Sequence, residues 1–158
     1  MRDGDSVTFD GVTFTAHDLG PGESHADSYW VLEGSRRAAF IGDEVLNGVH
    51  AYTADGHTTA WLANLDRLQR ALAAIPVIYP GHGDPGGPEL LDWQQRYLTA
   101  YRRAVAELSH GLLVLSDSAK AQLVTRMEQF LPSKNLEFLI GLGADPVAAE
   151  LAAESRRR

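Results

Sequence analysis

The sequence predicts an α+β fold in which a β-rich segment precedes a helical one. Short apolar runs separated by Gly and Pro turns fill roughly the first 85 residues, and this pattern is typical of strands. After residue 87, apolar residues instead recur at steps of three and four, which is typical of helices. Because helices can cover one face of a sheet, segments 1–87 and 88–158 are expected to pack as one domain.

Five strands are expected, each a short apolar or β-branched run bounded by turn residues. They span residues 7–9, 12–16, 29–33, 37–41 and 77–79. Asp10-Gly11 between the first two is the strongest hairpin signal in the chain, because Asp-Gly adopts the tight turn that joins antiparallel strands. Gly34-Ser35 predicts a second hairpin between the third and fourth strands.

Five helices are expected, one between the last two strands and the others after residue 87. They span about 60–75, 88–110, 117–131, 135–142 and 147–154. Thr58 or Thr59 is expected to cap the first helix and Ser116 the third, since these side chains accept hydrogen bonds from free amides. Asp145-Pro146 predicts the start of the last helix, as a cap followed by a proline.

The composition excludes several classes of function and of site. With 158 residues and 44% hydrophobic content, the chain is long enough for one domain with a core. A net charge of -7 disfavours a general affinity for nucleic acid or anionic membranes. No run is long and apolar enough to span a bilayer, and no signal peptide is recognised, so the expected location is cytoplasmic. The sequence has no cysteine, so any metal must be held by His, Asp or Glu.

Three potential metal ligands follow apolar strands on Gly-rich turns. They are His25 in Gly20-Pro-Gly-Glu-Ser-His-Ala-Asp-Ser28, Asp43 in Phe40-Ile-Gly-Asp43, and His82 in Tyr79-Pro-Gly-His-Gly83. Taken alone, His25 also fits a surface histidine, and Asp43 also fits a turn cap. The glycines on both sides of His82 favour a functional role, since they permit close backbone approach to a ligand. Together, two imidazoles and a carboxylate suit zinc, iron or manganese.

The order and local sequence of these turns resemble the second half of a metallo-β-lactamase-fold hydrolase. The resemblance covers about residues 5–85, and the later helices look like the C-terminal extension of hydrolase-like members. It implies half of an αββα sandwich, with β-hairpins and covering helices, followed by a helical extension. It also implies that His25 binds a first metal, that Asp43 bridges two metals and has the catalytic role, and that His82 binds the second.

Two departures from the family pattern affect this interpretation. The family turn places His directly after Pro-Gly, whereas Glu23 and Ser24 intervene here. The family's His-x-His-x-Asp-His motif, which provides the ligands of the first half, does not occur in the sequence. A hydrolytic zinc needs about three protein ligands and an open position. The chain alone is therefore expected to bind metal weakly, or not at all, and to be weak or inactive as an enzyme.

Three further residues are candidates for supporting roles. His50 and His57 follow Asp43 in a polar loop, where each is expected either to line a substrate pocket or to be exposed to solvent. Asp27 is expected either to orient His25 through a hydrogen bond or to stabilise the turn. An Asp at position 43 resembles hydrolases that act on thioesters, lactones or phosphoesters more than it resembles the lactamases.

Three functional hypotheses follow from these observations. In the first, the chain is a truncated member of a metal-dependent hydrolase family, in which a water activated by up to two zinc ions attacks an ester-type small molecule. In the second, it is a non-catalytic module with vestigial ligands, whose uncovered sheet face drives homodimerisation or packs against a missing N-terminal half. The third is a relative that uses iron for redox chemistry.

Overall fold

The computed structural model describes residues 2–157 and contains one mixed sheet. Its strands lie side by side in chain order, from β1 to β5. Their bounds are β1 Ser6–Phe9, β2 Val12–Gly20, β3 Asp27–Leu32, β4 Ala38–Leu46 and β5 Ile78–His82. The first four strands pair antiparallel, and β5 pairs parallel to β4. Helix α1, Thr58–Ala71, makes the crossover that the parallel pair requires.

The expected hairpins are present in the sheet. Phe9 pairs with Val12 across Asp10-Gly11, and both turn residues have positive φ values of 49° and 76°. Asp and Gly are among the few residues that adopt this conformation readily, which explains why the sequence identified this turn. The Gly34-Ser35 region likewise joins β3 to β4, where Leu32 pairs with Ala38.

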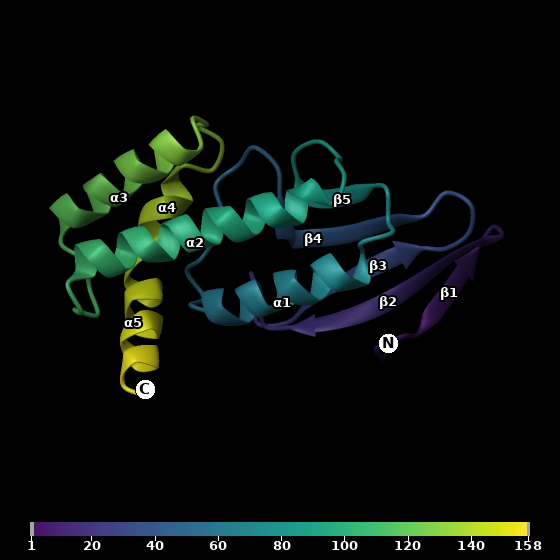
Figure 1. Cartoon of the computed structure of the whole chain (residues 1–158), viewed down its shortest axis with the longest axis horizontal. Coiled ribbons are helices and arrows are strands. Elements are labelled where there is room, and N and C mark those ends of the chain that lie inside the picture. The colour runs from purple at the N-terminus through teal and green to yellow at the C-terminus, as the bar shows by residue number, and fades with distance from the viewer. Residues whose placement is uncertain (1, 158) are drawn as a thin grey trace.

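Four further helices follow the sheet. They are α2 Glu89–Ser109, α3 Asp117–Phe130, α4 Phe138–Leu142 and α5 Ala144–Ser155. Figure 1 shows α1 and the first part of α2 lying over one face of the sheet, with α3, α4 and α5 gathered beyond its end. The core lies between the sheet and the first two helices, where Ile41, Trp61 and Leu98 are almost entirely buried. This arrangement confirms the predicted α+β fold class.

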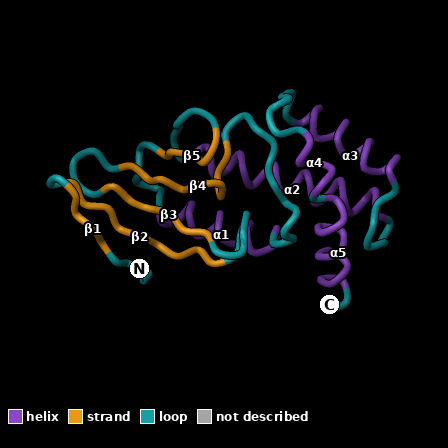
Figure 2. Tube along the Cα trace, turned by 180° about the vertical axis from the view of Figure 1, so that it is seen from behind, coloured by secondary structure: helices purple, strands orange, loops and turns teal. Residues whose placement is uncertain are grey.

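The other face of the sheet carries no helix among the described residues. Figure 2 shows this face from behind, with the helices on the far side of the strands. Three aromatic rings run across it: Phe14 on β2 lies 6.1 Å from Phe40 on β4, and Phe40 stacks on Tyr79 of β5 at 4.7 Å. Phe40 and Tyr79 remain 37% and 39% exposed. The second layer of the expected αββα sandwich would cover these rings.

Two helix starts differ from the prediction. No side chain at the start of α1 caps it; the amides of Thr58 and Thr59 instead donate to the carboxylate of Glu150 on α5, at 3.1 and 2.7 Å. Helix α5 begins at Ala144, so Asp145 lies in its first turn. The Asp145 carboxylate accepts from the Leu115 amide and pairs with Lys120. The prediction at Ser116 is confirmed, since its side chain accepts from the Ala119 amide.

The strand that carries Asp43 is longer than expected. Gly42 has a φ of +62° and marks an irregularity in the pairing with β5, but β4 continues to Leu46. Asp43 therefore lies within β4 near its end, whereas a sharp turn directly after Gly42 was expected. Within residues 2–157, no helix combines the length and apolar character needed to cross a membrane. The division of the chain at residue 88 stays a prediction.

Candidate metal centre

Asp43, within the last part of β4, lies beside His82, the last residue of the parallel strand β5. The Asp43 Oδ1 and His82 Nε2 atoms are 3.6 Å apart, and the two side chains are 44% and 53% exposed. Two ligands of a tetrahedral zinc with bonds of about 2.0–2.1 Å are separated by about 3.3 Å. The pair thus has nearly the spacing of two ligands on one ion.

Glu23 lies in the same small pocket as Asp43 and His82. Leu136 and Leu139 also line this pocket, so the helical extension forms part of its wall. Burial, together with the nearby carboxylates of Asp43, Asp27 and Asp55, raises the pKa of Glu23 to about 7. Neighbouring carboxylates repel one another when ionised. A bound cation would therefore stabilise the ionised form of Glu23.

Sequence reasoning did not select Glu23, although a signal was present. Glu23 directly follows Pro21-Gly22, the position at which the resembling family has its metal-binding His. A carboxylate is an alternative zinc ligand to an imidazole. The sequence-based prediction assigned the role of metal ligand to His25, the next histidine along the chain. Glu23 occupies the position expected for that ligand.

The backbone at this edge is shaped to admit the Asp43 carboxylate. A Cβ atom built on Gly81 would lie 1.9 Å from Asp43 Oδ1, so only glycine fits there. Gly83, with a φ of +89°, lies against the Asn47 carbonyl, and the Asn47 side chain donates to the carbonyl of Asp84 at 2.9 Å. The two glycines around His82 therefore let the β5 turn pack closely on β4. Two carboxylates and one imidazole in this setting fit a borderline divalent metal.

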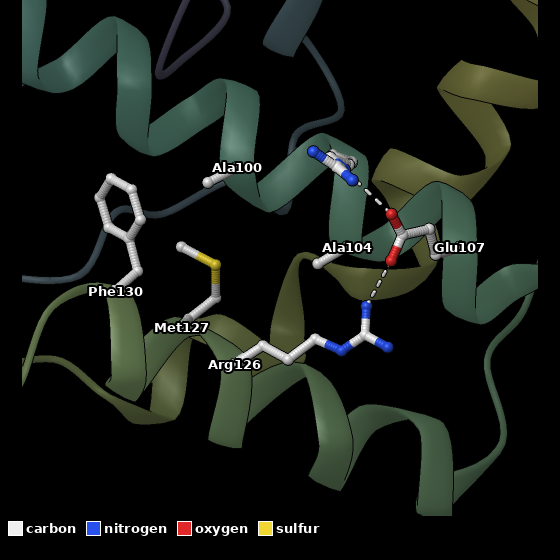
Figure 3. A pocket seen from close by; sticks show the side chains of 7 residues that line it. Ala100, Ala104, Glu107, Arg126, Met127 and Phe130 are labelled. Atoms are coloured by element: carbon white, nitrogen blue, oxygen red, sulfur yellow. Dashed lines mark hydrogen bonds and ion pairs between the residues drawn. The ribbon is translucent and has the colours of Figure 1, made fainter.

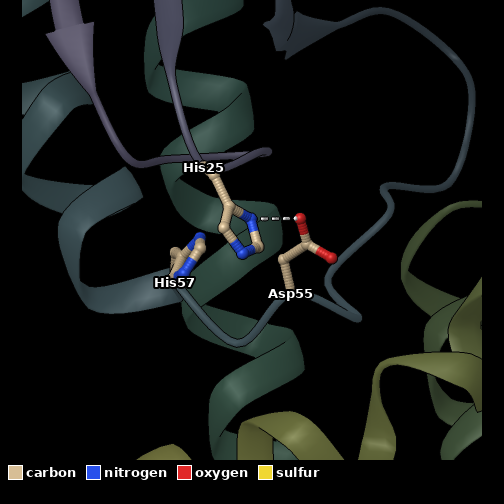
Figure 4. A group of neighbouring side chains, drawn as sticks. All are labelled: His25, Asp55 and His57. Carbon is tan, nitrogen blue, oxygen red and sulfur yellow. Dashed lines mark hydrogen bonds and ion pairs between the residues drawn. The ribbon is translucent and has the colours of Figure 1, made fainter.

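His25 belongs to a different group of side chains. Its Nδ1 lies 3.0 Å from Asp55 Oδ2, and its ring contacts that of His57 edge to face at 4.8 Å. Figure 4 shows His25, Asp55 and His57 converging from two loops. One ligand atom from each of the three lies within 4.8 Å of the others. Among the described residues, the predicted ligands thus divide into this group and the Asp43–His82 pair.

His50 has a structural role in the fold. It is fully buried, its Nε2 donates to the Ser133 carbonyl, and its Nδ1 accepts from the Tyr97 hydroxyl, both at 3.0 Å. The expectation of an exposed loop histidine is wrong for this residue, because α2 and the segment before α4 cover it. It still forms part of the wall of the Glu23 pocket.

Asp27 stabilises the turn that carries His25. Its two carboxylate oxygens accept from the amide and the hydroxyl of Ser24, at 3.0 and 2.9 Å. The carboxylate in contact with the His25 imidazole is that of Asp55. Of the two roles considered for Asp27, the structure shows the one in the turn.

A separate hollow between α2 and α3 offers no comparable chemistry. Its charged residues already neutralise one another, because Glu107 binds Arg103 and Arg126 at 2.9 and 2.7 Å. Figure 3 shows Glu107 above the Arg126 guanidinium, with Met127 and then Phe130 farther along the hollow. The arrangement is typical of helix packing.

Comparison with known proteins supports the fold. No family model matches the chain. A metallo-beta-lactamase type 2 from Bacteroides fragilis is 28% identical over 100 residues, which cover 61% of this chain and 39% of that protein. The chain therefore spans well under half the length of this curated relative.

Solved structures match over more of the chain. A metallo-beta-lactamase family protein from Thermus thermophilus superposes with a TM-score of 0.67 at 19% identity, over 99% of this chain and 49% of that one. A beta-lactamase domain protein from Burkholderia ambifaria gives 0.60 at 20% identity, over 98% and 46%. Both matches include the helical extension, which explains the coverage of nearly the whole chain. Sequence similarity and structure together show that the chain has the metallo-β-lactamase fold, over about half the length of the two solved structures.

Proposed function

We propose that this chain provides one half of the active site of a metal-dependent hydrolase. The observation that carries the proposal is the shared pocket of Glu23, Asp43 and His82, in which the Asp43 and His82 ligand atoms are 3.6 Å apart. These three residues would hold a zinc-class ion. Such an ion supplies Lewis acidity toward a carbonyl or phosphoryl oxygen and lowers the pKa of a water molecule.

Each residue of the Glu23 pocket has its own role in this proposal. Asp43 and His82, from adjacent strand ends, fix the position of the ion. Glu23, whose pKa is raised to about 7 in the metal-free pocket, would release its proton on binding the ion as a third ligand. Leu136 and Leu139 provide an apolar part of the pocket wall. The substrate proposed is a small ester, thioester, lactone or phosphoester, and zinc is the first metal to test.

The remaining ligands would come from outside the 158 residues. The matched structures are about twice as long as this chain, so the proposed whole enzyme includes a further ββα half. For the chain alone we propose weak metal binding and little or no turnover, since three ligands on one side leave the ion open to solvent.

Metal content after zinc loading tests this proposal. Glu23→Gln, Asp43→Asn and His82→Ala are each expected to lower zinc affinity at least tenfold. His110→Asn is the control, because His110 lies in the left-handed turn after α2, where Asn is also tolerated. Equal zinc affinity in all four variants and the wild type would refute the assignment of these ligands. A panel of ester, thioester, lactone and phosphoester substrates then identifies the reaction.

A second candidate function is a non-catalytic module that assembles with another copy of itself. The exposed stack of Phe40 on Tyr79 favours it, because an apolar ring pair on an open sheet face gains stability when covered. Light scattering during size-exclusion chromatography should then show a dimer, and Phe40→Glu should convert it to a monomer. Phe138→Glu, on a 69% exposed ring of α4, is the matched control. A monomeric wild type would exclude this function.

A further inference from the structure

The loops at the end of the sheet bring together a second set of metal-ligand side chains, separate from the Glu23 pocket. His25 comes from the turn between β2 and β3, whereas Asp55 and His57 come from the loop between β4 and α1. None of the three lines the pocket that holds Asp43 and His82. The three residues are called the His25 cluster below.

The hydrogen bond that His57 makes leaves one of its ring nitrogens, Nε2, able to bind a cation. Its Nδ1 lies 3.1 Å from the Ser24 carbonyl oxygen, which can only accept, so Nδ1 carries the proton. The lone pair of this imidazole is therefore on Nε2. Metal-binding histidines commonly donate from one ring nitrogen to a carbonyl and coordinate the metal through the other. The amide and hydroxyl of Ser24 in turn donate to Asp27. The turn between β2 and β3 therefore fixes the carbonyl that orients the His57 ring.

Asp55 is oriented in a similar way. Its Oδ1 accepts a hydrogen bond from the Tyr52 hydroxyl at 3.0 Å, which leaves Oδ2 facing His25 at 3.0 Å. Gly56, between Asp55 and His57, has a φ of +72°, a conformation that turns the chain sharply. This turn places the two side chains on the same side of the loop, as Figure 4 shows.

Exposure and donor chemistry define the ligand. The His25 side chain is 79% exposed and that of Asp55 26%, so an ion there keeps solvent in its open positions. Two imidazoles and one carboxylate are a donor set for Zn²⁺ and neighbouring divalent transition metals, whereas Mg²⁺ and Ca²⁺ prefer oxygen ligands. We propose that the His25 cluster is a second binding site for a divalent transition metal, formed by residues other than those of the Glu23 pocket, with Zn²⁺ as the probe.

The surface pair of His17 and Asp3 is a natural comparison within the chain. His17 Nδ1 lies 3.5 Å from Asp3 Oδ1, much like the His25–Asp55 contact. The His17 ring stacks on Tyr29, and this pair is not part of the metal-ligand group found among the described residues. A metal site at the His25 cluster should therefore depend on His57, whereas His17 should be irrelevant to zinc binding.

Isothermal titration of the metal-free chain with Zn²⁺ tests the inference. The Asp43→Ala/His82→Ala double variant removes the contribution of the Glu23 pocket, and in this background one zinc per chain is expected to remain bound. Adding His57→Ala or Asp55→Asn should weaken that zinc at least tenfold, and adding His17→Ala should not change its affinity. Asp55→Asn retains the shape of the side chain, so its effect is separable from misfolding, and circular dichroism checks each variant.

The results also separate this site from the proposed function. No zinc binding in the double variant would overturn the inference and leave the Glu23 pocket untouched. Unchanged affinity on adding His57→Ala and Asp55→Asn would also overturn it. Zinc binding that persists in the double variant but depends on the His25 cluster would support it, whether or not the Glu23 pocket also binds metal.

Discussion

The Glu150 carboxylate accepts hydrogen bonds from both the amide and the hydroxyl of Thr58, 92 residues earlier in the chain, at 3.1 and 2.5 Å. The Glu150 side chain thus caps α1 from α5, and its negative charge lies at the positive end of the helix dipole. Arg102 of α2 pairs with the same carboxylate at 3.5 Å, so three helices meet at this point.

Glu150→Ala should therefore destabilise the fold. Loss of the cap leaves the amides of Thr58 and Thr59 without their partner and removes one of the carboxylates that pair with Arg102. The expected loss in the free energy of unfolding is about 1–3 kcal/mol. Urea denaturation measures it. Glu33→Gln, which removes an exposed charge next to Arg37, is the control and should change stability by less than about 0.5 kcal/mol. Equal stability of both variants would show that the cap contributes nothing.

The stability of the protein should fall as pH rises through the neutral range, because of Glu44. Burial raises the pKa of Glu44 to about 8 from an ordinary value of 4.5, although Asn64 donates to one of its oxygens. A raised folded-state pKa stabilises the fold fully below about pH 4.5, and this contribution is lost as pH rises through about 8.

Glu44→Gln is expected to flatten this dependence. Thermal melts at about pH 6 and about pH 9, on either side of the Glu44 pKa, should show a smaller drop in Tm for Glu44→Gln than for the wild type, because the variant has no proton to lose at this position. The control, Glu137→Gln, changes a partly exposed partner of Lys134 and should keep the wild-type slope. The same slope in all three proteins would rule out Glu44 as the source.

Gly81 should tolerate no side chain. In Gly81→Ala the new Cβ would overlap Asp43 Oδ1, so Asp43 must move and the zinc affinity of the Glu23 pocket should fall at least tenfold. Gly141→Ala is the matched control, since its Cβ meets no atom within 4 Å and Ala favours a helix by up to about 1 kcal/mol. Competition with a zinc-binding dye measures affinity, and unchanged zinc affinity in Gly81→Ala would contradict the role of Asp43.

His50→Ala should destabilise the protein through lost packing and hydrogen bonds. The substitution leaves a cavity and removes the partner of the Tyr97 hydroxyl and the Ser133 carbonyl, at an expected cost of about 2–4 kcal/mol. Chemical denaturation checks it, with His110→Asn, at an exposed turn, as the comparison. A His50→Ala variant as stable as the wild type would return His50 to the list of candidate pocket residues.

The elements that depend on neighbouring residues could be predicted from the sequence. The Asp10-Gly11 hairpin and the Ser116 cap rest on contacts within a few positions, and both are confirmed. The cap of α1 could not be predicted, because Thr58 and Thr59 are good capping residues and nothing local shows that a distant glutamate takes this role. Tertiary structure here overrides local preference.

The candidate site shows the same division. The strand-end positions of Asp43 and His82 follow from short apolar runs and glycines, and the two residues do lie together. Whether Glu23 or His25 joins them depends on where the turn between β2 and β3 directs each side chain, and residue type alone does not determine this. His50 was misjudged for a related reason, since its burial comes from α2 and the segment around Ser133, both remote in sequence.

The chain-order arrangement of the sheet has a consequence for how the protein forms during synthesis. Strands β2, β3 and β4 each pair with the strand made just before them, so these local pairings can form while the ribosome is still translating the helices that follow β5. The amino end of α1 must nevertheless wait for α5, because Glu150 lies 92 residues later in the chain than Thr58. A nascent chain stalled before α5 would therefore carry a formed sheet and a frayed first helix.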